Sequence, residues 1–314
     1  MTGAEILVEL IQAIVLVAIA PLMAGIVSKL KALMQGRRGA GILQPYRDLR
    51  KLLRKDSVTS RNSSWLFRGI PYVCMASMIV LAMMTPFIYT GVLAPYGDLV
   101  AVVYLFTMYR FAMVLGGLEG GSTFGGMGSS REMMMSVLIE PALLLAIATL
   151  AVLSGAGTDM GDISSAISAL GLAAVGPALI LAGASFMMTL LAENARIPFD
   201  NPTTHLELTM VHEAMLLEYS GRDLAMMELS SQMRLTIFMA MLGSLFFPWG
   251  IATELTAQAL VLSAVVMAVK MLLVAFALSV VESVLCKSRL FKTPNLLTAS
   301  FTLSLMAMIS LYIL

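Results

Sequence analysis

The chain has 314 residues, of which 59% are hydrophobic and 12% charged, and its mean hydropathy is +0.90. Soluble domains usually carry about 25% charged residues, so this composition indicates an integral membrane protein. The net charge of +1 gives no reason to expect nucleic acid as a partner. With two cysteines and two histidines, the chain lacks the ligands for an iron–sulfur cluster, a haem pair or a zinc site. We therefore expect no metal site, no bound cofactor and no catalytic residue on this chain.

Hydrophobic runs recur along the whole sequence. A spanning helix needs about 20 mostly apolar residues. We predict an all-α, polytopic membrane protein of about eight transmembrane helices, with residues 1–314 as a single membrane domain. The predicted spans are 6–28, 69–91, 98–117, 133–154, 173–193, 234–250, 257–284 and 295–314. Two hydrophilic connections, 35–67 and 194–233, are long enough to have structure of their own.

Positive charge is distributed unevenly over this layout. The first, third, fifth and seventh connections, with the residues beside them, hold 18 of the 20 Lys and Arg residues. The opposite connections and the N-terminal segment carry acidic residues instead. Cytoplasmic loops are enriched in Lys and Arg, so we predict that these four connections are cytoplasmic and that both termini lie outside.

The connection 35–67 contains an amphipathic pattern. After Pro45, which suits the first position of a helix, apolar residues recur at helical spacing and cations fill the opposite face. Such a helix lies in the membrane interface with its apolar side down. Two interpretations stay open: an anchor to lipid headgroups, or a platform for a soluble partner. The basic pair Arg37 and Arg38 stands just before it.

Several charges fall inside or at the ends of the predicted spans. Arg110 and Glu140 lie on consecutive spans at a similar depth, about 10–12 Å from the cytoplasmic side, which predicts an ion pair. A charge facing lipid at mid-membrane costs about 2.5–3.5 kcal/mol, so such residues face protein or water. The others are Glu193, Lys270 and Glu282. They are either buried pairs that fix helix packing or parts of a proton path, and both interpretations stay open.

The connection 194–233 is the densest in charged and polar chemistry. Asn201 followed by Pro202 predicts the start of a helix that continues to Leu217 and is ended by Gly221. On such a helix Glu207 and Glu218 share one stripe, and neighbouring carboxylates raise each other's pKa and pass protons. The segment is too apolar to be a solvated loop, so we expect it to pack under the helices or inside a partner.

Motifs in both connections resemble a known family. Residues 192–200 (Ala-Glu-Asn-Ala-Arg-Ile-Pro-Phe-Asp), Glu207-Leu208 and Glu218-Tyr219-Ser220-Gly221 resemble the signature loop of the H-type membrane subunit of respiratory complex I. Gln35-Gly36-Arg37-Arg38-Gly39 and the amphipathic segment after it fit the same family. Thr203 and His205, however, stand where complex I usually has acidic residues, and Ala40 replaces its usual proline.

These departures are more similar to the related subunit of membrane-bound group 4 [NiFe] hydrogenases, the subunit 4 family of formate hydrogenlyase and hydrogenase-4. Residues 201–210, Ser130-Arg131-Glu132 and Ile139-Glu140-Pro141 carry this similarity. The resemblance implies a membrane-anchor and proton-coupling subunit in a prokaryotic cytoplasmic (inner) membrane. Its partners would be soluble hydrogenase-like large and small subunits, an iron–sulfur subunit, antiporter-like membrane subunits and the lipid bilayer. The NiFe centre and the iron–sulfur clusters would be on the partner subunits.

The resemblance also gives roles to residues of an oxidoreductase subunit that is not catalytic alone. The proton-path or coupling residues would be Glu140, Glu193, Asp200, Glu207, Glu218, Glu282, Lys270 and Arg110. Docking of the soluble arm or fixing of loops would fall to Arg37, Arg38 and Arg196. The alternative is the quinone-site membrane subunit of a complex I-like oxidoreductase, for which a quinone would be the cofactor. An independent ion transporter is disfavoured because the sequence shows no internal repeat.

Overall fold

The computed structural model describes the greater part of the chain as helix. The described residues are 3–60, 63–89, 97–200, 210–252, 256–288 and 292–313. Over these residues the only extended pairing is two isolated bridges, Tyr89 with Ala252 and Asp98 with Asp159. The all-α architecture expected from the sequence is therefore confirmed.

Eight helices of 17 or more residues in the described part of the chain each overlap one predicted span, although α9 begins well before the span predicted at 234–250. They are α1 (Gly3–Met34), α3 (Trp65–Met84), α4 (Leu99–Glu119), α5 (Thr123–Ser154), α7 (Pro177–Glu193), α9 (Gly221–Met241), α10 (Ala257–Val284) and α11 (Thr293–Ile313). Shorter elements are α2 (Gln44–Leu53), α6 (Met160–Leu170), the 3₁₀ helix η2 (Gly171–Ala174), α8 (His212–Leu216) and the π-helix η3 (Leu242–Phe246).

Six of the described helices are long and apolar enough to cross a membrane: α1, α3, α4, α5, α10 and α11. Helix α7 is apolar but shorter. Helix α9 begins with a polar stretch that includes Arg222, Asp223 and Glu228, and it is not among the six. The structure thus supports a polytopic membrane protein, and the number of about eight spans stays a prediction.

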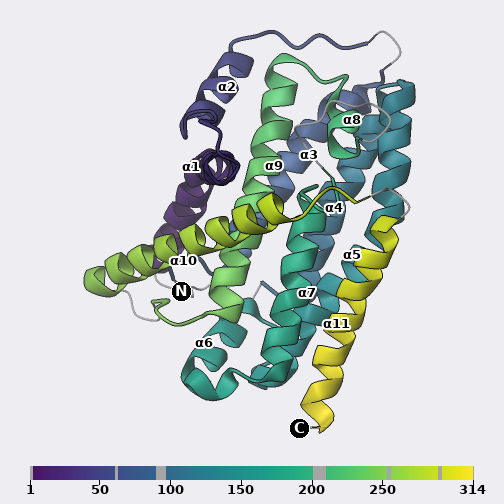
Figure 1. Ribbon diagram of the computed structural model, residues 1–314. Helices are drawn as coiled ribbons and strands as arrows, with labels where there is room; N and C mark the ends of the chain where they lie inside the picture. Colours follow the sequence, from purple (N-terminus) through teal and green to yellow (C-terminus); the bar gives the residue numbers. More distant parts are fainter. Residues whose placement is uncertain are drawn as a thin grey trace.

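Successive connections meet at opposite ends of the bundle. At one end Val58 N donates to Ser220 Oγ (2.8 Å) and Ser288 N donates to Pro198 O (2.9 Å), which joins the first, fifth and seventh connections. At the other end Leu99 N donates to Thr158 O at 3.0 Å. In Figure 1, α2 and α8 lie at the top and α6 at the bottom. The basic connections therefore share one end, called here the basic end, and the α6 end lies opposite.

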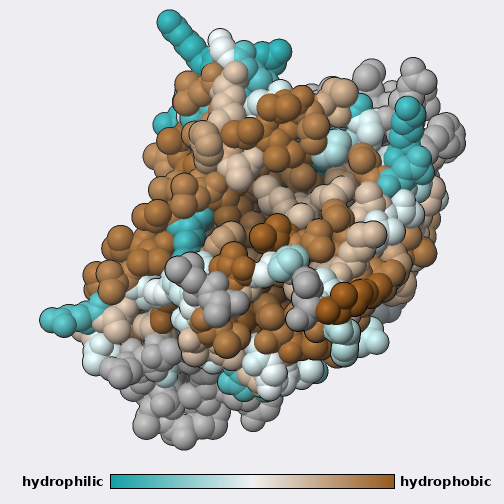
Figure 2. Space-filling view, turned by 60° about the horizontal axis from the view of Figure 1, so that its bottom comes forward, coloured by the Kyte–Doolittle hydropathy of each residue, from teal (hydrophilic) through white to brown (hydrophobic). Residues whose placement is uncertain are grey.

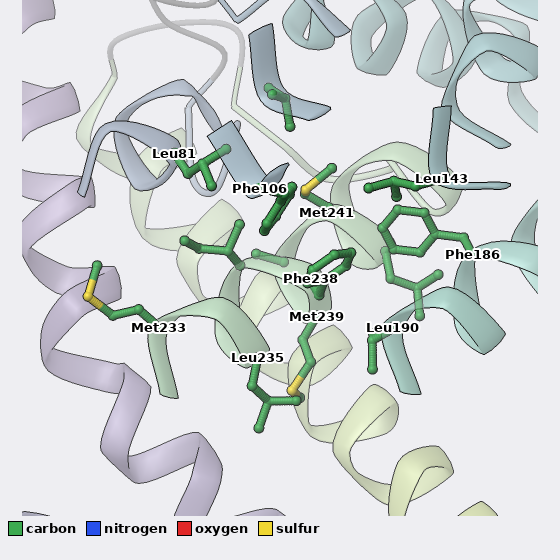
Figure 3. Close-up of a cluster of buried hydrophobic side chains, with 14 of the residues drawn as sticks. Leu81, Phe106, Leu143, Phe186, Leu190, Met233, Leu235, Phe238, Met239 and Met241 are labelled. Carbon is green, nitrogen blue, oxygen red and sulfur yellow. The ribbon is translucent and has the colours of Figure 1, made fainter. Parts of the chain in front are cut away.

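Helix α9 forms the centre of the packing. Its second half is buried, and Phe238 stacks on Phe106 of α4, with ring centroids 4.4 Å apart, and contacts Phe186 of α7 at 5.8 Å. Figure 3 shows these rings among leucine and methionine side chains. Helices with this much mutual burial hold the polar residues of α9 in fixed positions.

Two helices lie at the edges of this core. Helix α11 packs along α5 and α7, where Ser185 Oγ donates to Ser300 O at 2.8 Å. Helix α10 crosses the bundle obliquely and contacts α1, α9 and η3 (Figure 1). Figure 2 shows a broadly hydrophobic surface on one face of the molecule, as expected for a protein that contacts lipid or other membrane subunits.

The helix predicted from Pro202 to Leu217 is wrong as a continuous element. Met210 O accepts from Arg131 Nη1 (2.8 Å), and Val211 N donates to Asp200 Oδ2 (3.1 Å). Side chains therefore hold backbone groups that a helix would need, and α8 begins only at His212. Gly221 does not end a helix but is the first residue of α9. Glu207 lies outside the described residues, and the single helix that would align it with Glu218 does not form.

The start of α9 gives a testable prediction. Gly221 has φ +54°, and a Cβ at this position would clash with the backbone carbonyl of Asp56. We expect Gly221→Ala to lower the free energy of unfolding by about 1–3 kcal/mol, since both the left-handed backbone and the loop contact oppose a side chain. Thermal melting of the purified protein measures this. Gly41→Ala is the matched control because its Cβ would meet no atom within 4 Å. Equal melting of both variants would contradict the prediction.

Candidate functional site

Arg110 of α4 lies inside the bundle with 2% of its side chain exposed and contacts three carboxylates. Its Nη1 lies 2.8 Å from Glu140 Oε1, and its Nε lies 3.3 Å from Glu132 Oε1. Its Nη2 contacts Glu193 at the end of α7. The predicted Arg110–Glu140 pair is confirmed, and two further carboxylates from α5 and α7 join it.

Arg234 of α9 brings a second buried guanidinium to the same place. It lies 3.9 Å from Glu193 Oε2 through Nη1 and 2.7 Å from His212 Nε2 through Nη2. His212 Nδ1 is 3.5 Å from Glu132 Oε2. These contacts close a loop of five residues, Arg110, Glu193, Arg234, His212 and Glu132, which we call the charge ring. Glu140 is attached to it through Arg110.

Electrostatics fix the state of the histidine. Burial lowers the pKa of His212 well below its ordinary value of 6.5, and the neighbouring Arg234 lowers it further. The imidazole is therefore neutral near pH 7. Since its Nε2 accepts from the Arg234 guanidinium, the proton is on Nδ1, which faces Glu132. The ring thus places a neutral donor beside a buried carboxylate.

The charge ring leaves hydrogen-bonding capacity unused. Arg110 Nε, Glu132 Oε2, His212 Nδ1 and Arg234 Nε are buried and have no hydrogen-bond partner among the described residues. Buried polar atoms are normally satisfied by protein or by ordered water. A cluster of unsatisfied donors and acceptors within a few ångströms provides the several polar partners that a buried water needs.

Glu140 connects the charge ring to the surface. Its side chain is 33% exposed, while those of Glu132 and Glu193 are 2% and 1% exposed. Glu140 and Arg110 line a cavity of about 550 Å³ between α4 and α5, together with Thr107 and Ser136. Of the three carboxylates that contact Arg110, Glu140 is therefore the one that reaches the exterior of this chain, and Glu132 and Glu193 are enclosed.

A second set of ion pairs fixes the segment after α7. Glu282 of α10 accepts from Arg196 Nη1 at 2.6 Å and pairs with Lys31 of α1 at 2.8 Å. Asp200 pairs with Lys287 at 2.7 Å. These pairs connect Arg196 and Asp200, which follow α7, to α1 and α10. They are separate from the contacts of the charge ring, although Arg196 is only three residues from Glu193 in the sequence. The loop-fixing role of Arg196 stays a prediction.

The structure leaves the other predicted residues apart from the ring. Glu218 is exposed after α8, and its side chain lies against Gly120. Lys270 has no ion pair among the described residues and lines a different cavity. Arg37 and Arg38 are exposed beyond α1 at the basic end.

Three members of the ring were not predicted as site residues: Glu132, His212 and Arg234. The span assigned to 234–250 made Arg234 a boundary residue, whereas α9 begins at Gly221 and buries it. Glu132 likewise stood just before a span assigned to 133–154, whereas α5 begins at Thr123. The available signal was the spacing of Glu132 and Glu140, which are eight residues apart and so lie near one face of a helix.

A family model described as NADH dehydrogenase matches residues 6–313. The chain belongs to this family. Formate hydrogenlyase subunit 4 of Escherichia coli (strain K12) is 36% identical over 308 residues, covering 98% of this chain and 99% of that protein. Hydrogenase-4 component C of the same organism is 35% identical over 306 residues, covering 97% and 95%. NADH-ubiquinone oxidoreductase chain 1 of Arabidopsis thaliana is 27% identical over 233 residues, covering 71% and 68%.

A solved structure shares the fold. One chain of the membrane-bound sulfane sulfur reductase (MBS), an archaeal respiratory membrane complex, matches with a TM-score of 0.84 at 20% identity, covering 98% of this chain and 99% of that one. The resemblance drawn from the two connections, to the complex I H-type subunit and to the formate hydrogenlyase and hydrogenase-4 branch, is confirmed. Apolar helices and relatives together identify the chain as an integral membrane protein.

The charge ring predicts an order of stabilities. We expect Glu193→Gln to lower the free energy of unfolding by about 3–5 kcal/mol, because it leaves two buried guanidinium groups short of a counter-charge. Glu140→Gln should cost less, since Glu140 is partly exposed and Arg110 keeps two other carboxylates. Denaturation of the purified variants compares the two. A larger loss for Glu140→Gln would contradict the assignment of Glu193 as the link between the arginines.

Proposed function

We propose that this chain is the membrane-anchor and proton-coupling subunit of a group 4 hydrogenase or formate hydrogenlyase-like complex, and that it docks the soluble redox arm to the membrane. The observation that carries the proposal is the charge ring, a buried set of titratable groups with one outlet at Glu140. The relatives named formate hydrogenlyase subunit 4 and hydrogenase-4 component C supply the enzyme class. The chain would act in a prokaryotic inner membrane, with the basic end in the cytoplasm and both termini outside.

The partners in this proposal are those that the family resemblance implies. Soluble hydrogenase-like large and small subunits and an iron–sulfur subunit would hold the NiFe centre and the clusters. Antiporter-like membrane subunits would lie beside this chain in the lipid bilayer. This chain is not catalytic alone in the proposal, because electron transfer takes place on the partners.

The charge ring would couple the state of the redox arm to proton binding through the contacts of its arginines. A carboxylate beside a guanidinium has a lower pKa than one whose guanidinium has moved away. Arg234 and His212 contact each other, and His212 lies on α8, in the connection that follows Asp200. A shift of this connection when the redox arm changes state would therefore change the proton affinity of Glu132 and Glu193. Glu140, in contact with the exterior, would exchange the proton.

Docking would use the basic end. The apolar side of α2 packs on α1 and α9, with Leu49 buried, so the helix is held by its own chain. Its cations face outward and line a hollow of about 530 Å³, formed by Arg47, Arg50, Lys51, Arg54 and Lys55. This arrangement favours the platform for a soluble partner over a pure lipid anchor, because lipid is not required to cover the apolar side. Charge complementarity then predicts an acidic surface on the arm.

The coupling role gives a prediction for Glu140→Gln. Glutamine is nearly isosteric with glutamate but does not titrate, so the complex should assemble at normal yield while proton translocation falls at least several-fold. Hydrogen turnover should fall with it where electron and proton transfer are tightly coupled. The measurements are assembled complex per membrane protein, hydrogen turnover and proton uptake. Asp162→Asn, which removes an exposed charge at the α6 end, is the control and should change none of them.

Two results would separate the interpretations of Glu140. Normal assembly with full turnover and full proton uptake would remove the coupling role and leave the chain as an anchor. Losses of assembly and activity in equal proportion would make the Arg110–Glu140 pair a packing contact, because leaving a buried guanidinium short of a counter-charge destabilises the subunit.

The docking role gives a prediction for the double variant Arg37→Glu and Arg38→Glu. Both residues are exposed at the basic end, so charge reversal should repel an acidic arm and release it, while the subunit still inserts. Co-purification of the soluble subunits with membranes measures the effect. Lys292→Glu reverses another exposed charge of the basic connections and is the control. An arm that stays bound after both arginine reversals would overturn the platform.

A further inference from the structure

A second cavity, of about 560 Å³, lies between α7, η3 and α10, away from the charge ring. Its walls are apolar side chains of the three elements, among them Leu179, Met187, Phe246, Trp249 and Leu273. Two glycines of the lining, Gly183 and Gly243, leave room in the wall. The volume is that of small-molecule pockets, which run to roughly 300–1,000 Å³.

Lys270 supplies the one charged group of this lining. Its Nζ is buried and has no hydrogen-bond partner among the described residues. Glu282, the other charged group on α10, is held by Lys31 and Arg196. A charged amine inside an apolar wall is unfavourable without a counter-charge. Among the described residues none provides one, and the lining of the cavity contains no acidic side chain.

The cavity opens on the hydrophobic surface of the protein. Ile180 and Leu273, on opposite walls, are each 63% exposed, and Phe247 is 51% exposed. An occupant therefore enters from the bilayer. It must match hydrocarbon walls with hydrocarbon and the amine with an anion, which together describe an anionic amphiphile.

The position of the cavity indicates that the headgroup of the amphiphile lies at the α6 end of the bundle. The lining includes Val175, just before α7, and Trp249, just after η3, both at the α6 end of the bundle. Tryptophan suits the headgroup level of a membrane. Side chains on helices lean toward the helix N-terminus, so the stem of Lys270 extends toward Ala257, the first residue of α10, which follows Trp249 in the chain.

We propose that this cavity binds one anionic phospholipid, with its phosphate on Lys270 Nζ and an acyl chain along α7 and η3. A partner helix is the less suitable occupant. A helix is about 10–12 Å wide and packs through a long ridge, whereas this cavity holds about 560 Å³ and has a single charged group in its lining. The π-helical turn η3 forms part of the wall, a deviation from α-helix that occurs frequently at functional sites.

Trp249 provides a direct probe of the cavity. The chain has two tryptophans, and Trp65→Phe removes the other, which is exposed at the start of α3. The full chain is placed in nanodiscs of phosphatidylcholine containing a minor fraction of lipid brominated on its acyl chains. We expect brominated phosphatidylglycerol to quench Trp249 at a several-fold lower fraction than brominated phosphatidylcholine. Lys270→Met should abolish this difference, and Lys270→Arg should keep it.

Lys292→Met is the matched control, because it removes an exposed lysine outside the cavity and should leave the preference unchanged. Equal quenching by both lipids in the unmodified chain, or an undiminished preference in Lys270→Met, would overturn the proposal. The whole purified complex gives a second measurement: by native mass spectrometry, Lys270→Met should lose one bound phosphatidylglycerol. Unchanged lipid with weakened binding of a membrane subunit would assign the cavity to an acidic side chain of that subunit instead.

Discussion

Two guanidinium groups buried inside an apolar bundle set the strongest constraint on this fold. Arg110 and Arg234 are 2% and 1% exposed, and neither charge is tolerable there without counter-charges. Meeting that requirement brings the start of α5, the end of α7 and α8 against α4 and α9. Glu193 serves both arginines, so the position at which α7 ends and the level at which α9 packs depend on each other. Arg234, in the second half of α9, thus lies within the bundle because its charge is matched there.

The same pairing extends into the connection that follows α7. Arg196 is held by Glu282 of α10, and Asp200 is held by Lys287 and by the backbone of Val211. The segment between α7 and α8 is therefore tied to α10 on one side and to the charge ring on the other. A displacement of this connection necessarily changes contacts in the ring, since His212 follows Val211 directly. In the proposed function, this is the route by which a movement of the connection would reach the charge ring.

The sequence predicted the helices and part of the site, and each of these predictions depended on a different pattern. Apolar runs located the spans, and equal depth on consecutive spans located the Arg110–Glu140 pair. Arg234, Glu132 and His212 were missed because hydropathy places a helix boundary where polarity rises, whereas α5 and α9 continue as helices through polar residues that have partners. The predicted helix from Pro202 failed for a related reason. Helix propensity is a local property, so it takes no account of the hydrogen bonds from Arg131 to the Met210 carbonyl and from the Val211 amide to Asp200.

Lys270 differs from the other buried charges, because no described residue of the chain supplies its counter-charge. Each charge in the ring and in the Glu282 cluster finds its counter-charge on another element of the same protein. Lys270 lies among apolar residues on an exposed face, and none of the described carboxylates reaches it. In the lipid-binding proposal, its counter-charge belongs to the surroundings. The stability of this region then depends on the composition of the bilayer, whereas the members of the charge ring find their counter-charges within the bundle.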